Sequence, residues 1–471
     1  MNDRNNLNEN QFNNGSFDLS KCRKVHFIGI GGVSMSTLAV IAKDLGCQVS
    51  GSDDNINQNA IKELIEMGIK VYSPLSASNI KDPDLVVYTA AVHTDNPELA
   101  AAIDRGIHSI TRAEYLGYIM TGYKNRMGVS GTHGKSTTTA MLYEIFDSGN
   151  DKPTLACGAV LPRLGKAYSI GNKENFIYEA CEYTDSFLHF NPTTAIITNI
   201  ELDHVDYFDG MESLIKSFNA SLRGSEKAVV LMDDDNCMKA VQGYEGKVVT
   251  VSLKNENASY FAANLTSERG LYSFDLYREG KLVEKISLNV PGIHNAINAL
   301  CACACAIENG ADSVMCREGI KRFHGIGRRF ERLGNVNGGE IYIDYAHHPS
   351  EIQATLNTAR SMEYGRIVGV FQSHTYTRTS RFKSEFASAL SLCDKVFIAP
   401  IYPAREDISL KTVTEEQLGA MIPGSVVLES FDEIIRAVAN ECRDGDMVIF
   451  IGAGNIDRAA RDMVAAAEKN S

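Results

Sequence analysis

A run of small and charged residues that follows an apolar stretch has the chemistry of a phosphate-binding loop. Residues 127–139 have the sequence MGVSGTHGKSTTT. Its glycines, Gly131 and Gly134, let backbone N–H groups converge on an anion, and the helix expected after the loop adds its positive N-terminal end. Lys135 can reach the terminal phosphates of a nucleotide, and the hydroxyl of Ser136 can hold Mg²⁺. The loop therefore predicts a site for ATP.

The match is to a shortened GxxGKS motif, because Val129 stands where the complete Walker pattern has its first glycine. The alternative interpretation is a glycine-rich turn that Ser and Thr residues cap without any nucleotide. The residues that we expect to contact ATP in this loop are Gly131, Thr132, His133, Gly134, Lys135, Ser136 and Thr137.

Polar residues at the ends of two later apolar segments could complete a metal site. Residues 176–182 are predicted to form a strand that ends in acids, and residues 195–199 a second strand that an acidic segment with His204 follows. Metal ligands gather at strand ends beside a phosphate loop in open α/β sheets. The competing interpretation is a solvated glutamate and a structural histidine. Our candidate Mg²⁺ ligands are Ser136, Glu179 and His204, with Glu182 as the alternative acid.

The N-terminal part predicts a second nucleotide-binding unit. A strand over residues 24–30 runs into a glycine turn, and a helix is expected over residues 37–45. Ser34 occupies the position of the third glycine of a dinucleotide fingerprint, so the pattern favours a nucleotide or nucleotide-sugar over NAD. Further strands are expected before Asp53 and over residues 85–88. The alternative interpretation of the glycine turn is that its glycines only close a turn and bind no nucleotide. The candidate contacts are Gly29, Gly31, Gly32 and Asp53, the last where an acid meets a ribose hydroxyl.

The remainder of the chain predicts a helix with two paired amides, a hinge and a third domain. Asn295 and Asn298 lie one turn apart at the start of a helix, where they could face one site or simply cap the helix. A glycine-punctuated, basic segment, residues 323–331, predicts a hinge. Strands are then expected to alternate with helices in a doubly wound sheet, over residues 340–343, 367–371, 395–399 and 447–451. Polar clusters at their carboxyl ends, residues 344–349, 373–378, 402–406 and 452–455, define a site edge.

Composition excludes several classes of protein. The net charge of -13 argues against nucleic acid as the main partner, because a broad basic face is missing. The eleven cysteines form no CxxC pairs at zinc spacing and predict reduced thiols, with Cys301, Cys303 and Cys305 in a buried helix. We expect no membrane-spanning segment and a flexible, Asn-rich N-terminal tail.

From residue 24 to about residue 460 the chain resembles the Mur ligase family of ATP-dependent peptidoglycan precursor enzymes. The resemblance rests on the segments HFIGIGG, GTHGKSTTT, NIELDHVDYF, GIHNAINAL, GIGRRFE, DYAHHPSE, FQSHTYTRT and IYPARE. It implies an α/β protein with a Rossmann-like N-terminal domain for the UDP-sugar, a central P-loop ATPase-type domain and a C-terminal Rossmann-like domain that receives the amino acid. The expected bounds are 1–20 for the tail, then 21–122, 123–327 and 328–471 for the three domains.

The resemblance also implies an activity. It implies that ATP, with Mg²⁺, phosphorylates the carboxylate of UDP-N-acetylmuramate and that L-alanine then attacks the acyl phosphate. The reaction would take place in the cytoplasm, by a protein that does not insert into the membrane. The resemblance leaves the oligomeric state open. Lys135 would clamp the β- and γ-phosphates, Ser136 would bind one Mg²⁺, and Glu179 with His204 would hold a second metal near the γ-phosphate. Asn295, Arg329 and Asp344 would meet the ATP, and the residues expected near the muramoyl carboxylate and the amine are His347, His348, His374 and Arg378.

Two departures from the family pattern and three alternatives accompany this interpretation. Later-acting relatives carry a carbamylated lysine where this chain has Asn219, so we expect no carbamate, and Ser34 alters the glycine turn. The close alternative is the recycling ligase that attaches a tripeptide to the same UDP-sugar. A folate polyglutamylating ligase would not need the N-terminal glycine unit, and a non-catalytic nucleotide sensor would not need Lys135, Glu179 and His204.

Overall fold

The computed structural model describes residues 19–89, 91–149, 151–204, 207–404, 406 and 411–470. Most of the expected N-terminal tail, and Arg405 of the strand-end cluster at residues 402–406, lie outside the described residues. The chain divides into two compact units. The first comprises the described residues of Met1–Phe261, Arg278–Lys281 and Ala299–Gly319, and the second those of Ala262–Tyr277, Leu282–Asn298 and Ile320–Ser471.

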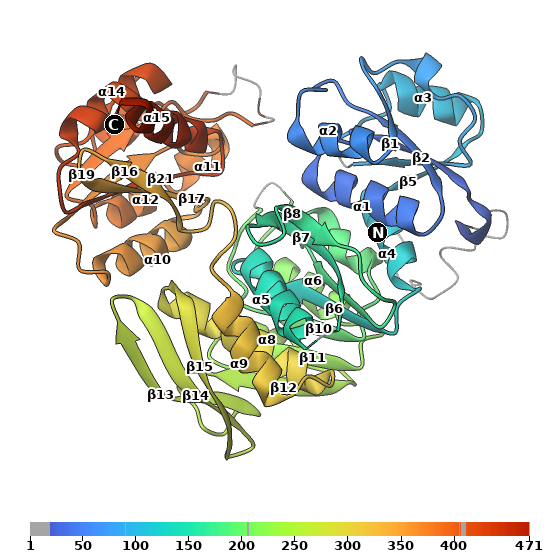
Figure 1. Cartoon of the computed structure of the whole chain (residues 1–471), viewed down its shortest axis with the longest axis horizontal. Helices are drawn as coiled ribbons and strands as arrows, with labels where there is room; N and C mark the ends of the chain where they lie inside the picture. Colours follow the sequence, from blue (N-terminus) through green and yellow to red (C-terminus); the bar gives the residue numbers. More distant parts are fainter. Residues whose placement is uncertain are drawn as a thin grey trace. The chain divides into compact units, whose positions relative to one another are not determined.

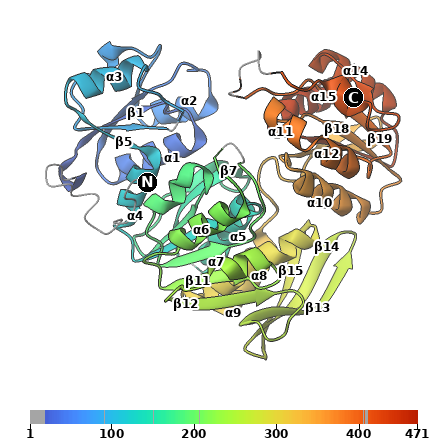
Figure 2. The same cartoon turned by 180° about the vertical axis from the view of Figure 1, so that it is seen from behind.

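The N-terminal part of the first unit is a five-stranded parallel sheet in the order β3-β2-β1-β4-β5 (Figures 1 and 2). This order confirms the Rossmann-like expectation. The first strand ends at residue 28 and not at residue 30, because Gly29 turns the chain with φ of 77°. Its elements are β1 (Lys24–Ile28), α1 (Val33–Asp44), β2 (Gln48–Ser52), α2 (Asn59–Glu66), β3 (Lys70–Tyr72), β4 (Leu85–Tyr88), α3 (Pro97–Asp104), β5 (His108–Thr111) and α4 (Arg112–Met120).

The central sheet has ten strands in the order β15-β14-β13-β12-β11-β10-β6-β9-β7-β8. Strands β12, β11, β10, β6, β9 and β7 are parallel, so the carboxyl ends of β6, β9 and β10 meet at one edge. The strands are β6 (Asn125–Ser130), β7 (Thr154–Leu161), β8 (Lys166–Ser169), β9 (Asn175–Glu179), β10 (Thr194–Ile197), β11 (Lys227–Leu231), β12 (Lys247–Ser252), β13 (Tyr260–Glu268), β14 (Leu271–Arg278) and β15 (Lys281–Pro291).

Helical segments connect the strands of this region and follow them in the chain. They are α5 (Lys135–Ser148), the 3-10 segment η3 (Tyr183–His189), α6 (Met211–Ser221), α7 (Asp235–Ala240), α8 (Ile293–Glu308) and α9 (Ser313–Arg322). The expectation of a buried cysteine helix is confirmed, because Cys301, Cys303 and Cys305 of α8 have no exposed surface. The strands β13, β14 and β15 were not predicted from the sequence.

The second unit contains a six-stranded sheet in the order β16-β17-β21-β18-β19-β20, in which β16 alone of the paired strands is antiparallel to its neighbour. The four strands expected from the sequence correspond to β17, β18, β19 and β21. Its strands are β16 (Glu331–Val336), β17 (Gly339–Asp344), β18 (Arg366–Phe371), β19 (Lys395–Ile398), β20 (Val426–Val427) and β21 (Asp446–Ile451). Its helices are α10 (Pro349–Arg360), α11 (Tyr376–Arg381), α12 (Lys383–Leu390), α13 (Glu415–Gly419), α14 (Phe431–Glu441) and α15 (Ile456–Asn470). None of the helices described is both long enough and apolar enough to cross a bilayer.

A buried carboxylate joins the strand ends of the N-terminal sheet. Glu98 of α3 accepts hydrogen bonds from the hydroxyl of Ser52 at the end of β2, from the amide of Asn79 at 2.7 Å and from the N–H of Ser76 at 3.1 Å. The ring of His26 in β1 lies 3.5 Å away. Burial by itself raises the pKa of this carboxyl, but the hydrogen bonds outweigh burial and the pKa of Glu98 is lowered.

This lowered pKa predicts a pH-dependent contribution to stability. A carboxyl whose pKa is lower in the folded chain stabilises the fold above its unfolded pKa of ~4.3, and the contribution is lost as pH falls through the folded value. We expect Glu98→Gln to reduce the free energy of unfolding at pH 7 by about 1–3 kcal/mol, and to weaken the dependence of that free energy on pH on the acid side. Urea unfolding at several pH values measures both effects. The exposed Glu66 supplies the control Glu66→Gln, and equal stability of Glu98→Gln and the parent at neutral pH would contradict the prediction.

Candidate active site

Both glycines of the expected phosphate loop are required by its backbone. Gly134 is the N-cap of α5, with φ of 81° and ψ of -3° in the left-handed region. Gly131 has φ of 132°, and a Cβ atom there would lie 2.1 Å from Oγ1 of Thr198. The loop therefore passes close to the end of β10 and then turns directly into the helix.

Hydrogen bonds from the segment after β10 hold the loop in place. The N–H of Thr132 donates to the carbonyl of Asn199 at 3.0 Å, and the N–H of His133 donates to the Asn199 side chain at 2.8 Å. The hydroxyl of Thr198 donates to the carbonyl of His133 at 2.6 Å. Since these two loop N–H groups have protein acceptors, the N–H groups most suited to an anion are those of the first turn of α5, which have no acceptor within the helix.

The ammonium group of Lys135 pairs with the buried carboxylate of Glu182, which the sequence analysis considered only as the alternative metal ligand. Its Nζ donates to the carboxylate of Glu182 at 3.1 Å, to the carbonyl of Gly131 at 2.6 Å and to that of Thr132 at 3.0 Å. Burial by itself lowers the pKa of Lys135, but the charge of Glu182, with those of Cys181 and Glu179, raises it. Glu182 is only 1% exposed, so its charge is compensated inside the protein. The ammonium group is therefore charged and fixed at the start of α5.

Two candidate metal ligands, Ser136 and Glu179, are hydrogen-bonded to each other. The hydroxyl of Ser136 donates to Oε2 of Glu179 at 2.7 Å. The backbone N–H of Gly158 in β7 donates to the same oxygen at 2.9 Å. A Cβ atom at Gly158 would lie 2.6 Å from this oxygen, so a glycine is needed there. A hydroxyl and a carboxylate oxygen are ligands that suit Mg²⁺, so the pair fits this ion.

His204 lies against Glu182. Its Nε2 is 3.7 Å from Oε1 of Glu182 and 3.9 Å from Oδ2 of Asp203. Its ring packs on that of Tyr183, with 4.6 Å between the centroids. Glu182 therefore contacts both the Lys135 ammonium and the His204 ring. That His204 and Glu179 share a metal ion stays a prediction.

Asn219, which stands in the place of the carbamylated lysine of some relatives, has structural partners. Its side-chain amide donates to the carbonyl of Ala240 at 2.7 Å and to that of Gln242 at 3.1 Å. Both acceptors lie at the end of α7, so Asn219 joins α6 to that helix.

In the N-terminal glycine turn, the side chain of Asp53 accepts two backbone hydrogen bonds. Its Oδ2 accepts from the N–H of Gly31 at 2.9 Å, and its Oδ1 accepts from that of Asn55 at 2.9 Å. Asp53 thus orders the turn that leads, through Gly32 as N-cap, into α1. Its expected contact with a ribose, and those of Gly29, Gly31 and Gly32 with a nucleotide, stay predictions.

The sequence analysis missed Arg112, which follows β5 directly. Its guanidinium donates to the hydroxyl of Ser34 at 3.0 Å, so the serine of the altered glycine turn has a partner. Burial lowers the pKa of Arg112, against the opposing charges of Cys181 and Glu179. Within the described part of the chain Arg112 has no carboxylate partner at salt-bridge distance. A half-buried guanidinium without such a partner is a suitable contact for an anionic ligand.

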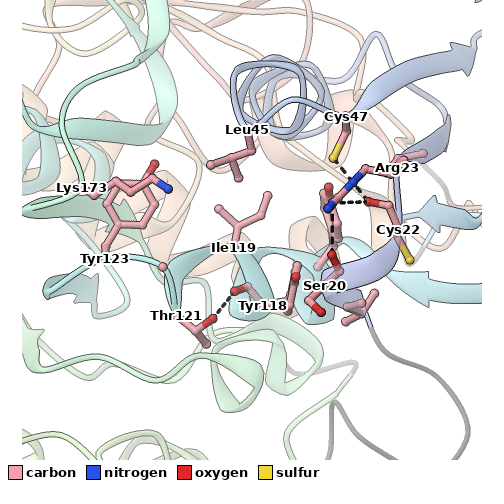
Figure 3. Close-up of a pocket in the computed structure, with 14 residues that line it drawn as sticks. Ser20, Cys22, Arg23, Leu45, Cys47, Tyr118, Ile119, Thr121, Tyr123 and Lys173 are labelled. Carbon is pink, nitrogen blue, oxygen red and sulfur yellow. Dashed lines mark hydrogen bonds between the residues drawn. The ribbon is translucent and has the colours of Figure 1, made fainter.

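A separate pocket of about 210 Å³ lies in the first unit (Figure 3). Arg23 and Val25, at the start of β1, line it together with Leu45, Cys47 and Tyr118. The glycine turn follows the opposite end of β1. The pocket is therefore not part of the candidate site.

In the second unit, the paired amides expected at the start of α8 contact each other. The amide of Asn298 donates to Oδ1 of Asn295 at 3.1 Å, and the amide of Asn295 donates to the carbonyl of Pro291 at 2.7 Å. Both side chains are buried. The contact of Asn295 with ATP stays a prediction.

Asp344 and Arg329 lie at the carboxyl end of β17 and in the loop before β16. The carboxylate of Asp344 accepts from the N–H groups of Phe330 at 2.7 Å and Ala346 at 2.8 Å. Burial raises the pKa of Asp344 despite the nearby charge of Arg329 and these hydrogen bonds. The guanidinium of Arg329 lies over the ring of Tyr345, 5.1 Å from its centroid.

The histidines expected to receive the amino acid divide into two environments. The guanidinium of Arg378 donates to Nδ1 of His374 at 3.4 Å, and the ring centroid of His374 lies 6.0 Å from that of His347. His348 is buried, with Nδ1 2.7 Å from the hydroxyl of Ser350 and its ring 5.1 Å from that of Phe382. The structure therefore brings His347, His374 and Arg378 together, and places His348 against α10 and the residue before α12.

Family models match the chain in three successive segments. Residues 24–124 match the model described as "Mur ligase family, catalytic domain", and residues 129–306 match "Mur ligase middle domain". Residues 328–454 match "Mur ligase, glutamate ligase domain".

Curated proteins and solved structures extend this similarity over almost the whole chain. The chain is 42% identical over 447 residues to the UDP-N-acetylmuramate--L-alanine ligase of Caldanaerobacter subterraneus subsp. tengcongensis, which covers 93% of this chain and 96% of that protein. It is 41% identical over 446 residues to the protein of the same name from Acetivibrio thermocellus, with 93% and 95% covered. The crystal structure of the UDP-N-acetylmuramate-alanine ligase of Thermotoga maritima matches with a TM-score of 0.81 at 28% identity, covering 95% of this chain and 100% of that chain.

The contact between Gly158 and Glu179 generates a prediction about metal-dependent nucleotide binding. We expect Gly158→Ala to displace the Glu179 carboxylate from Ser136, because the added methyl group would lie 2.6 Å from Oε2. Partners that orient metal ligands typically contribute ~10–100-fold to metal affinity. Calorimetric titration of ATP, with and without Mg²⁺, should show that the variant loses most of the gain due to Mg²⁺. Gly365→Ala is the control, since a methyl group there meets no atom closer than 3.7 Å. An undiminished Mg²⁺ gain in Gly158→Ala would count against the role of Glu179.

Proposed function

Because the chain belongs to the Mur ligase family, we propose that it is an ATP-dependent ligase that joins L-alanine to the carboxylate of UDP-N-acetylmuramate in peptidoglycan precursor synthesis. The relatives that carry this activity in their names are about 40% identical and align with 93% of the chain. The observation that carries the proposal is the loop at the start of α5, where Lys135 pairs with Glu182 and the hydroxyl of Ser136 donates to Glu179, a set of side chains whose chemistry suits ATP and a divalent ion.

The first chemical step is a phosphoryl transfer. A carboxylate oxygen of UDP-N-acetylmuramate attacks the γ-phosphorus of ATP, and the bond to the β,γ-bridging oxygen breaks to give an acyl phosphate and ADP. The Lys135 ammonium would neutralise charge on the transferring phosphoryl group. Mg²⁺ bound by Ser136 and Glu179 would neutralise further phosphate charge. Glu182, which pairs with Lys135, keeps the ammonium group charged and in place until ATP arrives.

The second step forms the C–N bond. The neutral amine of L-alanine attacks the carbonyl carbon of the acyl phosphate, inorganic phosphate leaves with the electron pair of the broken C–O bond, and the nitrogen loses a proton. His347, His374 and Arg378 are the proposed residues for the alanine and the muramoyl carboxylate, because they converge at the carboxyl ends of β17 and β18. Asn295, Arg329 and Asp344 are the proposed ATP contacts of the second unit.

We assign the proposed steps to three domains. The N-terminal domain, residues 21–122, would bind the UDP-sugar through Gly29, Gly31, Gly32 and Arg112. The central domain, residues 123–327, would bind ATP, and the C-terminal domain, residues 328–471, would receive alanine. His348, whose ring packs against Phe382, would support the alanine site from behind.

The function is tested by ADP release with UDP-N-acetylmuramate and each amino acid in turn, and with the tripeptide that the recycling ligase would use. We expect release with L-alanine, and none with the tripeptide alone. In the same assay, Lys135→Ala should lower kcat by about 10²–10³-fold, because an electrostatic clamp on the reacting phosphate is lost. Turnover above a tenth of the parent in Lys135→Ala would exclude the assignment of the loop, and a preference for the tripeptide would favour the recycling reaction.

Arg112 generates a separate prediction, because its guanidinium has a hydroxyl partner and no carboxylate partner among the described residues. We expect Arg112→Ala to raise KM for UDP-N-acetylmuramate about 10–100-fold, the value of a charge-assisted hydrogen bond, and to leave KM for ATP nearly unchanged. Steady-state kinetics with each substrate varied in turn measures both constants. The exposed Arg105 provides the control Arg105→Ala. A parallel rise of both KM values would indicate a general structural role for Arg112.

A further inference from the structure

Two consecutive residues beside the candidate site have a strained backbone. Thr184 has φ of 55° and ψ of 29°, and Asp185 has φ of 56° and ψ of 24°. This left-handed conformation is unfavourable for most residues other than glycine, above all for the β-branched Thr184, while aspartate adopts it more readily. Such strain persists where surrounding contacts determine the backbone, and it concentrates at functional sites. Contacts with neighbouring side chains must therefore hold this strained backbone in place.

Those contacts are made by the carboxylate of Asp185. Its Oδ2 accepts a hydrogen bond from the hydroxyl of Tyr207 at 2.8 Å, and its Oδ1 accepts one from the hydroxyl of Ser217 in α6. Tyr207 belongs to the segment that follows His204, and Ser217 is buried. Asp185 thus joins the segment after β9 to the segment after β10 and to α6.

The two segments joined in this way carry the groups that surround Lys135. The first carries Glu182 and Tyr183, and the second carries His204. Glu182 pairs with Lys135 and lies 3.7 Å from Nε2 of His204, while the ring of Tyr183 packs on the imidazole. His204 also has a left-handed backbone, with φ of 50°. The position of the imidazole therefore depends on how the second segment is held against the first.

We propose that Asp185 is a positioning residue, which fixes His204 and Glu182 relative to Lys135 through its hydrogen bonds with Tyr207 and Ser217. The inference rests on the proposed function, since it concerns the phosphate and metal site of the ligase. Asp185 contacts neither ATP nor metal in this role. Its carboxylate holds two strand-end segments in a strained geometry that their own sequences do not favour.

The test compares variants of the full chain that remove the clasp, which we define as Asp185, Tyr207 and Ser217. Asp185→Ala removes both hydrogen bonds, Tyr207→Phe removes one and keeps the ring, and Ser217→Ala removes the other. The control is Ser221→Ala in the same helix, because that hydroxyl donates at 2.7 Å to the carbonyl of Phe218 in its own helix. Asp185→Asn is the conservative variant, since asparagine tolerates the left-handed region and retains hydrogen-bonding groups.

The main readout is the affinity for Mn²⁺ in the presence of ATP, measured by electron paramagnetic resonance, beside the affinity for ATP without metal. We expect Asp185→Ala to weaken Mn²⁺ binding about 10–100-fold, as for other residues that orient a metal site, because the proposed ligand His204 would lose its position, and to weaken metal-free ATP binding much less. We expect kcat to fall more than KM for ATP rises, and Asp185→Asn to restore most of the loss. The double variant with Asp185→Ala and Tyr207→Phe should bind Mn²⁺ no more weakly than Asp185→Ala alone, because both substitutions remove the same hydrogen bond.

The outcomes separate this inference from the proposed function. Suppose that the parent binds Mn²⁺ and ATP and releases ADP with alanine. If Asp185→Ala then binds Mn²⁺ as tightly as the parent and as Ser221→Ala, the inference is overturned and the proposed function stands. If the parent itself shows no alanine-dependent ADP release, the proposed function fails first.

A further variant separates positioning from stability. Asp185→Gly removes the carboxylate and relieves the backbone strain, so we expect it to retain the melting temperature of the parent or exceed that of Asp185→Ala, and yet to show the same weak Mn²⁺ binding. Mn²⁺ affinity that instead follows melting temperature across Asp185→Ala, Asp185→Gly and Asp185→Asn would show that Asp185 acts only on the stability of the fold.

Discussion

The buried ammonium group of Lys135 is the constraint on which the central site depends. A charge removed from water must be matched by opposite charge or by hydrogen bonds. Here Glu182 and the carbonyls of Gly131 and Thr132 supply that match. The negative phosphates of ATP supply the same kind of partner, so Glu182 occupies the electrostatic role that the nucleotide would take over. This exchange explains why a buried acid lies beside a phosphate-binding lysine, and why Glu182 lies between Lys135 and His204.

The parallel sheet places these groups together, although they are distant in sequence. Strands β6, β9 and β10 are neighbours, and the loop before α5, the acids after β9 and the segment after β10 all leave the sheet at the same edge. The hydrogen bonds between the loop and Asn199 then fix the distance between two of these three connections. Rigid strands thus set the approximate geometry, and side-chain contacts such as that between Ser136 and Glu179 set the final position of each functional atom.

The sequence predicted the fold well, because strands and glycine turns leave local signals. Apolar strands followed by polar residues identified β4, β17, β18 and β21 almost to the residue, and glycine spacing located the start of α5. The pairing of Lys135 with Glu182 could not be predicted, because Glu179 ends β9, Glu182 follows three residues later, and only the three-dimensional structure shows which acid faces the lysine. Arg112 was missed for a similar reason, since its partner Ser34 is far away in the sequence. The strands β13 to β15 lie outside the repeating strand–helix pattern on which the prediction was based.

An acidic protein that binds two polyanionic nucleotides needs local positive charge at defined points. The net charge is -13, so overall attraction of substrate cannot supply it. Lys135, at the start of α5, and Arg112, directly after β5, are two such cations. The carboxylate of the UDP-sugar and the γ-phosphate of ATP must come within bonding distance, although both are negative. Lys135 and Arg112, with the divalent ion that Ser136 and Glu179 would hold, are the charges that could offset this repulsion during phosphoryl transfer.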